Sequence, residues 1–130
     1  MQPWLQYAMP GTVLFVCQHG AGKSRMAAAW FNADPPPGWH ATSAGIEPQT
    51  SVSQHAPRLL AGTPAAAHLD SAMPRPVAAV DTADVTVAID CSVPGSVGWQ
   101  LSNTEFNAAM ADELRLLVAE LARTLRPPDD

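Results

Sequence analysis

Residues 12–24 of this 130-residue chain read TVLFVCQHGAGKS, and this stretch decides the fold. Its first five residues are a continuous apolar run with β-branched members, which is typical of a strand buried on both faces of a sheet. Cys17 follows the run, and two glycines precede Lys23 and Ser24. Residues 24–32 then carry apolar side chains at helical spacing. The stretch therefore predicts a strand, a glycine-containing turn and a helix.

The rest of the chain alternates between strand-like and helix-like segments. The last helix is the clearest, because its apolar side chains step by three or four residues, and Asn103 or Thr104 is expected to cap its start. That apolar stripe consists of Phe106, Met110, Leu114, Leu117, Leu121 and Leu125. The patterns predict strands at 39–44, 84–90 and 97–101, and helical segments at 52–61, 77–84 and 105–125.

Strands separated by helices predict an α/β fold with a parallel sheet and crossover connections. We expect one domain over residues 12–126, with short tails at 1–11 and 127–130. In such sheets ligands bind beyond the carboxyl ends of the strands. Cys17 and Cys91 each follow a predicted strand, so both are expected at that edge.

The composition argues against several classes of protein. The formal net charge is −5 and no basic cluster is present, so a nucleic-acid surface is not expected. Two cysteines are too few for a disulfide scaffold or a zinc site made by the protein alone, and a reducing cytoplasmic location is the natural expectation. No secretory leader or apolar stretch long enough to span a membrane is visible, so no membrane partner is expected.

The turn itself predicts an anion site. Successive backbone N–H groups between a strand end and a helix start can converge on one concavity, and glycines permit the positive φ values that such turns use. Cys17 at this point is expected to ionise more readily than a free thiol, with a hydrogen bond from Ser24 and a full charge from Lys23, the only lysine in the chain. The predicted oxyanion-binding residues are Gln18, His19, Gly20, Ala21, Gly22, Lys23 and Ser24.

Two other interpretations of the turn have to be considered. Cys17 could be a small buried hydrophobic residue after a strand, although the neighbouring Gly-Lys-Ser favours the anion site. The turn also approaches the GxxxxGK[ST] motif of nucleotide hydrolases, with Cys17 where the first glycine belongs. That motif needs a downstream strand ending in a magnesium-binding aspartate, a role for which only Asp90 is available.

These motifs resemble the low-molecular-weight protein tyrosine phosphatases and the thiol-dependent arsenate reductases that share their fold. The resemblance rests on VLFVC-QHGAGK-SRMAAA, on Ser43-Ala44-Gly45 with Pro48 nearby, and on the strand DVTVAID, and it covers residues 12–125. It implies a four-stranded sheet of order 2-1-3-4 with helices on both faces. The loop with His19 is closer to the arsenate reductase branch. In this family Cys17 would be the nucleophile, and Lys23 and Ser24 would assist it.

The chain departs from the family in three ways. Lys23 replaces the family's arginine, which grips an oxyanion with two parallel N–H bonds that lysine cannot copy. The phosphatases use a late aspartate as general acid, a role worth about 10²–10⁴-fold, but residues 99–104 contain no carboxylate. Thioredoxin-coupled reductases use two further cysteines, whereas here only Cys91 is present.

The remaining candidate residues allow more than one role. Cys91 could resolve an oxidised or arsenylated Cys17 if their Cα atoms come within about 7 Å, or it could be an incidental thiol. Asp90 is interpreted as a strand-end cap or a substitute proton donor, and Trp99 as a wall of the site or a core residue. His40, His55 and His68 show no metal-ligand spacing, so neither metal nor cofactor is expected.

The sequence thus predicts a cysteine-dependent oxyanion enzyme, closest to arsenate reductases. Its substrate would be a small oxyanion or phosphoester, and an external thiol would supply electrons. Two alternatives stay open, namely a weakly active or non-catalytic oxyanion-binding or redox-sensing relative, and a tyrosine phosphatase with an atypical general acid.

Overall fold

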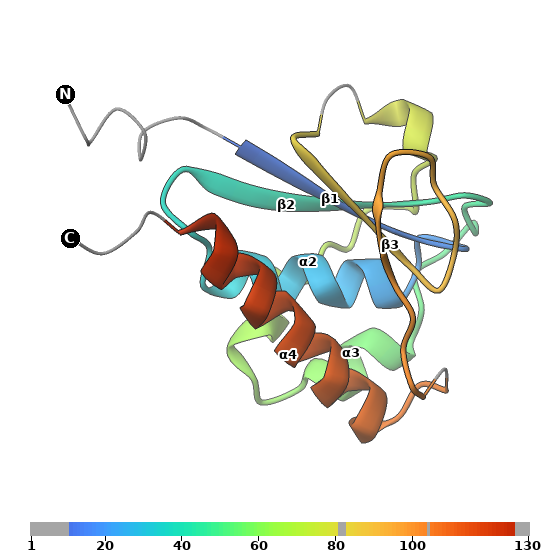
Figure 1. Cartoon of the computed structure of the whole chain (residues 1–130). Helices are drawn as coiled ribbons and strands as arrows, with labels where there is room; N and C mark the ends of the chain where they lie inside the picture. Colours follow the sequence, from blue (N-terminus) through green and yellow to red (C-terminus); the bar gives the residue numbers. More distant parts are fainter. Residues whose placement is uncertain (1–10, 81–82, 104, 127–130) are drawn as a thin grey trace, which may run out of the picture.

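The computed structural model describes residues 11–80, 83–103 and 105–126. Four parallel strands form one sheet in the order β2-β1-β3-β4, which confirms the predicted α/β fold and strand order (Figure 1). The strands are β1 (Gly11–Cys17), β2 (Trp39–Gly45), β3 (Val85–Ile89) and β4 (Val97–Trp99). The apolar residues 12–16 therefore lie in a central strand, β1, which is hydrogen-bonded to β2 on one side and to β3 on the other.

The register of the sheet brings the two chemically interesting strand ends together. Cys17, the last residue of β1, pairs with Gly45, the last residue of β2. On the other side of β1, Val16 pairs with Ala88, so β3 ends beside the same edge. The turn after β1, the end of β2 and Asp90 after β3 are consequently neighbours.

Three α-helices cover one face of the sheet, and they are α2 (Lys23–Ala33), α3 (His55–Leu60) and α4 (Ala108–Leu125) (Figure 1). A 3-10 helix, η1 (Pro64–His68), packs against α2 on the same side. Among the described residues, the opposite face carries the 3-10 helix η2 (Val77–Ala79) and the loops that flank β3. The helical cover of this face is therefore much thinner than that of the other.

The core lies mainly between the sheet and the helices. Alternate residues of β1 divide between the faces, with Val13 and Phe15 facing α2 and α4, and Leu14 and Val16 facing η2. Burial on both faces explains why this strand is apolar without interruption. Ala27 and the alanines beside it are buried in α2, and such small side chains let the helix lie close to the sheet.

Several predicted boundaries shift. Strands and helices begin and end within a few residues of the prediction, but residues 77–84 form helix only at Val77–Ala79 among the described residues, and η1 was not predicted. The last helix starts at Ala108, where the Asn107 side chain accepts a hydrogen bond from the Met110 amide at 2.9 Å. Asn103 is therefore not the cap, and Thr104 lies outside the described residues. Within the described ranges, no helix has the length and apolarity needed to cross a bilayer.

Candidate active site

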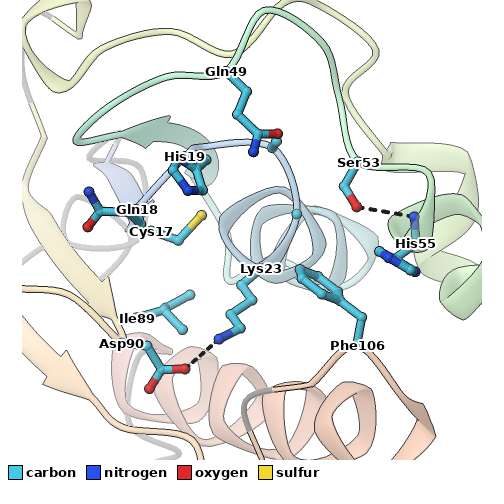
Figure 2. Close-up of a pocket in the computed structure, with 12 residues that line it drawn as sticks. Cys17, Gln18, His19, Lys23, Gln49, Ser53, His55, Ile89, Asp90 and Phe106 are labelled. Carbon is cyan, nitrogen blue, oxygen red and sulfur yellow. Dashed lines mark hydrogen bonds and ion pairs between the residues drawn. The ribbon is translucent and has the colours of Figure 1, made fainter.

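A pocket of about 360 Å³ opens at the carboxyl ends of β1 and β3 (Figure 2). The turn after β1 forms its floor, while the segment 49–55, Asp90 and Phe106 form its walls. The lining residues are Cys17, Gln18, His19, Ala21, Gly22, Lys23, Gln49, Ser53, His55, Ile89, Asp90 and Phe106. This edge is where ligands bind in open parallel sheets.

The backbone of the turn is held in place by hydrogen bonds from other segments. Each carbonyl oxygen from Cys17 to Gly22 accepts a hydrogen bond of 2.8–3.1 Å from a group outside the turn. Most of these donors are backbone amides of residues 46–53. Among the described residues, by contrast, no amide N–H from Gln18 to Gly22 has a partner. The C=O and N–H of a peptide group point in opposite directions. Because the carbonyls of the turn are hydrogen-bonded to other segments, we infer that its amide N–H groups face the pocket. We call this turn, Cys17–Ser24, the oxyanion cup.

Two glycines in close contact make the cup possible. Gly20 has a φ of +64°, a conformation that side chains rarely adopt, and it lies against Gly45 at the end of β2. A Cβ on Gly45 would lie 2.5 Å from the Gly20 nitrogen, and a Cβ on Gly20 would lie 2.6 Å from the Gly45 nitrogen. The Ser-Ala-Gly motif therefore contributes a position without a side chain, which lets the end of β2 pack on the cup.

Cys17 and Ser24 are in hydrogen-bond contact at the bottom of the cup. The Sγ of Cys17 lies 3.1 Å from the Oγ of Ser24, and both residues are buried. A hydroxyl at this distance can donate to a thiolate or accept from a thiol. Ser24 belongs to the first turn of α2, whose free amides and dipole add positive potential around the sulfur.

The Lys23 side chain forms an ion pair in the pocket. Its Nζ donates to Asp90 Oδ2 at 2.7 Å, and both side chains are largely buried (Figure 2). Asp90 has a positive φ of 53° and accepts from the Leu101 amide at 2.8 Å through Oδ1, so its carboxylate is held in place. Asp90 is thus both a strand-end cap and a wall of the pocket. The charge of Lys23 is already matched by a carboxylate.

Cys91 is not among the residues that line the pocket. It packs against Leu14, Val16 and Ala44 on the η2 face of the sheet, whereas Cys17 belongs to the core cluster on the helical face. Its thiol donates to the Val16 carbonyl at 3.5 Å, and both cysteines are free. Burial, and then the negative charge of Cys17, raise the pKa of the Cys91 thiol. The two cysteines are not bonded to each other, and a resolving role for Cys91 stays a prediction.

The outer wall of the pocket is made by residues that the sequence did not single out. The rings of His55 and Phe106 stack with centroids 5.0 Å apart, and the Ser53 amide donates to the Ala21 carbonyl at 2.9 Å. The spacing of apolar residues predicts Phe106 as part of the stripe of the last helix, but Phe106 precedes that helix and faces the cup. Trp99 packs in the core against Phe15 and does not line the pocket.

Gln18 and His19 line the pocket and also contact Glu47, two residues after β2 ends. Gln18 Nε2 donates to Glu47 Oε1 at 2.7 Å, and His19 Nδ1 lies 3.1 Å from the Glu47 carbonyl oxygen. No group of three or more His, Cys, Asp or Glu side chains in the described ranges is arranged to hold a metal ion.

No protein-family model matches the chain, and no curated protein does. Solved structures do match. A thioredoxin-dependent arsenate reductase from Corynebacterium glutamicum superposes with a TM-score of 0.71 at 20% identity, covering 95% of this chain and 69% of that one. An arsenate reductase from Archaeoglobus fulgidus has a TM-score of 0.64 at 29% identity, with 87% and 97% covered. An arginine phosphatase from Geobacillus stearothermophilus has a TM-score of 0.65 at 22% identity, with 89% and 93% covered.

The chain shares the fold of low-molecular-weight phosphatases and arsenate reductases. The resemblance seen in the sequence is confirmed at this level.

Proposed function

We propose that this protein is an arsenate reductase-like enzyme in which Cys17 attacks a tetrahedral oxyanion held by the cup. The observation that carries the proposal is the set of unpartnered amides above a buried sulfur, with every carbonyl of the turn tied away from it. Preorganised N–H donors are suited to an anion that carries extra charge as it reacts. The protein would work in the reducing cytoplasm.

The proposed chemistry needs no group beyond the cup and an external thiol. The Cys17 thiolate bonds to the arsenic of arsenate and hydroxide leaves, which gives a Cys17–arsenate thioester. An external thiolate then attacks the Cys17 sulfur, the electron pair of the S–As bond passes to arsenic, and arsenite leaves. A second external thiol reduces the mixed disulfide and restores Cys17. Two thiols are oxidised to one disulfide for each As(V) reduced to As(III).

Arsenate is favoured over a phosphate ester for two reasons. An alkoxide leaving group requires a proton donor, and the only carboxylate among the residues that line the pocket, Asp90, already accepts from Lys23. The placement of Cys91 outside the pocket also favours an external thiol as the source of electrons.

Turnover assays test the proposal directly. The full chain would be given arsenate with glutathione, mycothiol or thioredoxin, and separately p-nitrophenyl phosphate. Arsenite formation with one of these thiols is the expected result. Phosphate or sulfate binding without turnover on either substrate would instead identify a non-catalytic oxyanion-binding relative.

Lys23→Arg is expected to raise activity about tenfold, because a guanidinium can donate to Asp90 and to the oxyanion at the same time. The measurement is kcat/KM for arsenate reduction, with phosphate affinity determined by calorimetry. Lys23→Gln is the matched loss variant and should weaken both. Identical values in native protein and both variants would show that the side chain at position 23 does not touch the anion.

A phosphatase is the second candidate, because Asp90 lies in the pocket as a substitute for the missing late acid. Asp90→Asn separates the two functions. If Asp90 only competes with the oxyanion for Lys23, the substitution should tighten phosphate binding by about fivefold, since roughly one kcal/mol of attraction is freed. If Asp90 donates the proton, p-nitrophenyl phosphate turnover should fall by about 100-fold or more.

A further inference from the structure

Arg25 is the largest of the fully buried side chains in the described part of the chain, with only 1% of its surface exposed. It stands in the first turn of α2, next to Ser24. Burying a charged group is costly unless it is bonded and electrostatically compensated. The proposed reaction assigns no role to this guanidinium, so the burial of its charge is still unexplained.

The contacts of Arg25 tie it to the cup. Its Nε donates to the Gly20 carbonyl at 2.8 Å, and its Nη1 donates to the Asp70 carbonyl at 2.6 Å. Gly20 is the cup residue with positive φ and has no side chain of its own to fix it. By holding the Gly20 carbonyl below the turn, the arginine keeps the adjoining amides facing the pocket. The Nη2 of Arg25 is buried and has no partner among the described residues.

The balance of charge near the cup points to the same residue. The Lys23 ammonium is matched by Asp90 at 2.7 Å. Asp70, the carboxylate nearest to Arg25, lies 4.0 Å from it and is bound more closely by Arg75 at 2.6 Å. Two guanidinium groups therefore share one carboxylate, and one positive charge is left over. That charge is buried, where electrostatic interactions are stronger than in water.

The shifts in pKa agree with this geometry. Burial lowers the pKa of Arg25, while attraction from Asp70 and from Cys17 opposes the shift. Arginine stays protonated in proteins, so its charge remains beneath the cup. Asp70 has a lowered pKa, with burial opposed by the hydrogen bond from Arg75.

We infer that Arg25 is a positioning residue of the cup and supplies the unmatched positive charge that holds the oxyanion and the Cys17 thiolate. The inference rests on the proposed function. The inference extends the proposed function by making the buried Arg25, in place of Lys23, the principal cation of the site. Arg25, in the first turn of α2, thus donates a hydrogen bond to the Gly20 carbonyl and places a positive charge beneath the cup.

The test measures phosphate affinity by calorimetry and the rate of Cys17 alkylation by iodoacetamide at neutral pH in the full chain. Arg25→Met removes the bonds and the charge, and it is expected to weaken phosphate binding by about tenfold or more and to slow alkylation. Arg25→Lys keeps the charge, and it should recover a measurable part of both. Arg115→Gln, at an exposed arginine of α4, is the control and should match native protein.

The inference would be overturned if Arg25→Met and Arg25→Lys lost phosphate affinity and alkylation rate equally, in proportion to the fall in their unfolding temperatures. It would also be overturned if Arg25→Met bound phosphate as tightly as the native protein. If Arg25→Met does not fold, Arg25→Gln replaces it, and its phosphate affinity and alkylation rate are compared with those of Arg25→Lys. Absence of phosphate binding in the native protein would count against the proposed function, and Arg25 is then judged from alkylation alone. Phosphate binding without turnover would leave the test of Arg25 fully valid.

Discussion

Replacing Cys17 with serine is expected to abolish turnover, with a loss of roughly 10⁴-fold or more in kcat for arsenate reduction and for any phosphatase activity. The hydroxyl of serine is a far weaker nucleophile than a thiolate and cannot pass electrons to arsenic. The cup itself should persist, because its amides are held by bonds that do not involve the sulfur. Phosphate binding, measured by calorimetry, should therefore be kept or tightened in Cys17→Ser.

Cys91→Ser is the matched control for this substitution. Cys91 lies on the other face of the sheet and bonds the Val16 carbonyl, a role that a serine hydroxyl can also fill. Its turnover with an external thiol should stay within about threefold of native, as is usual for residues without contact to the reacting atoms. An equal loss in both variants would show that Cys91 takes part in the reaction and that the loop carrying it must move.

Gly45→Ala is expected to destroy oxyanion binding from a position that never touches the anion. The new Cβ would overlap the Gly20 nitrogen at 2.5 Å and the His19 carbonyl carbon at 2.5 Å, both of them backbone atoms. The cup must shift to admit it, which costs about 1–3 kcal/mol of stability and misplaces the amides. Phosphate affinity should fall by about 100-fold, since amides moved by an ångström no longer converge.

The control for Gly45→Ala is Gly98→Ala in β4. A Cβ on Gly98 meets no atom within 4 Å, and this glycine is not among those with positive φ. The same chemical change there should leave phosphate affinity and the unfolding temperature nearly unaltered. If Gly45→Ala binds phosphate like native protein, close packing of β2 on the cup is not what shapes it.

Much of the site could be predicted because it is local in sequence. The stretch around Cys17 contains its own strand, turn and helix start, so the elements that shape the cup lie within a few residues of one another. The Ser24 contact with Cys17 follows from that short range. The parallel sheet followed from the alternation of patterns, and the resemblance to a known family supplied its strand order.

What escaped prediction depends on contacts between distant segments. Asp90 meets Lys23 across 67 positions of sequence, and nothing in the sequence near either residue indicates this pairing. Phe106 fits the helical stripe by spacing, although the helix begins two residues later, at Ala108. The role of Arg25 could not be predicted, because sequence alone cannot tell a buried guanidinium from an exposed one.

The central claim is that outward-tied carbonyls leave a cup of amides that holds an oxyanion over Cys17. Mass spectrometry can follow the alkylation of each cysteine by iodoacetamide in the native protein, with and without phosphate, sulfate or arsenate. We expect these anions to slow the alkylation of Cys17 in a saturable manner, while chloride at equal ionic strength does not and Cys91 is unaffected. Alkylation of Cys17 at the same rate in the presence and absence of tetrahedral anions would show that the cup does not hold an oxyanion over Cys17.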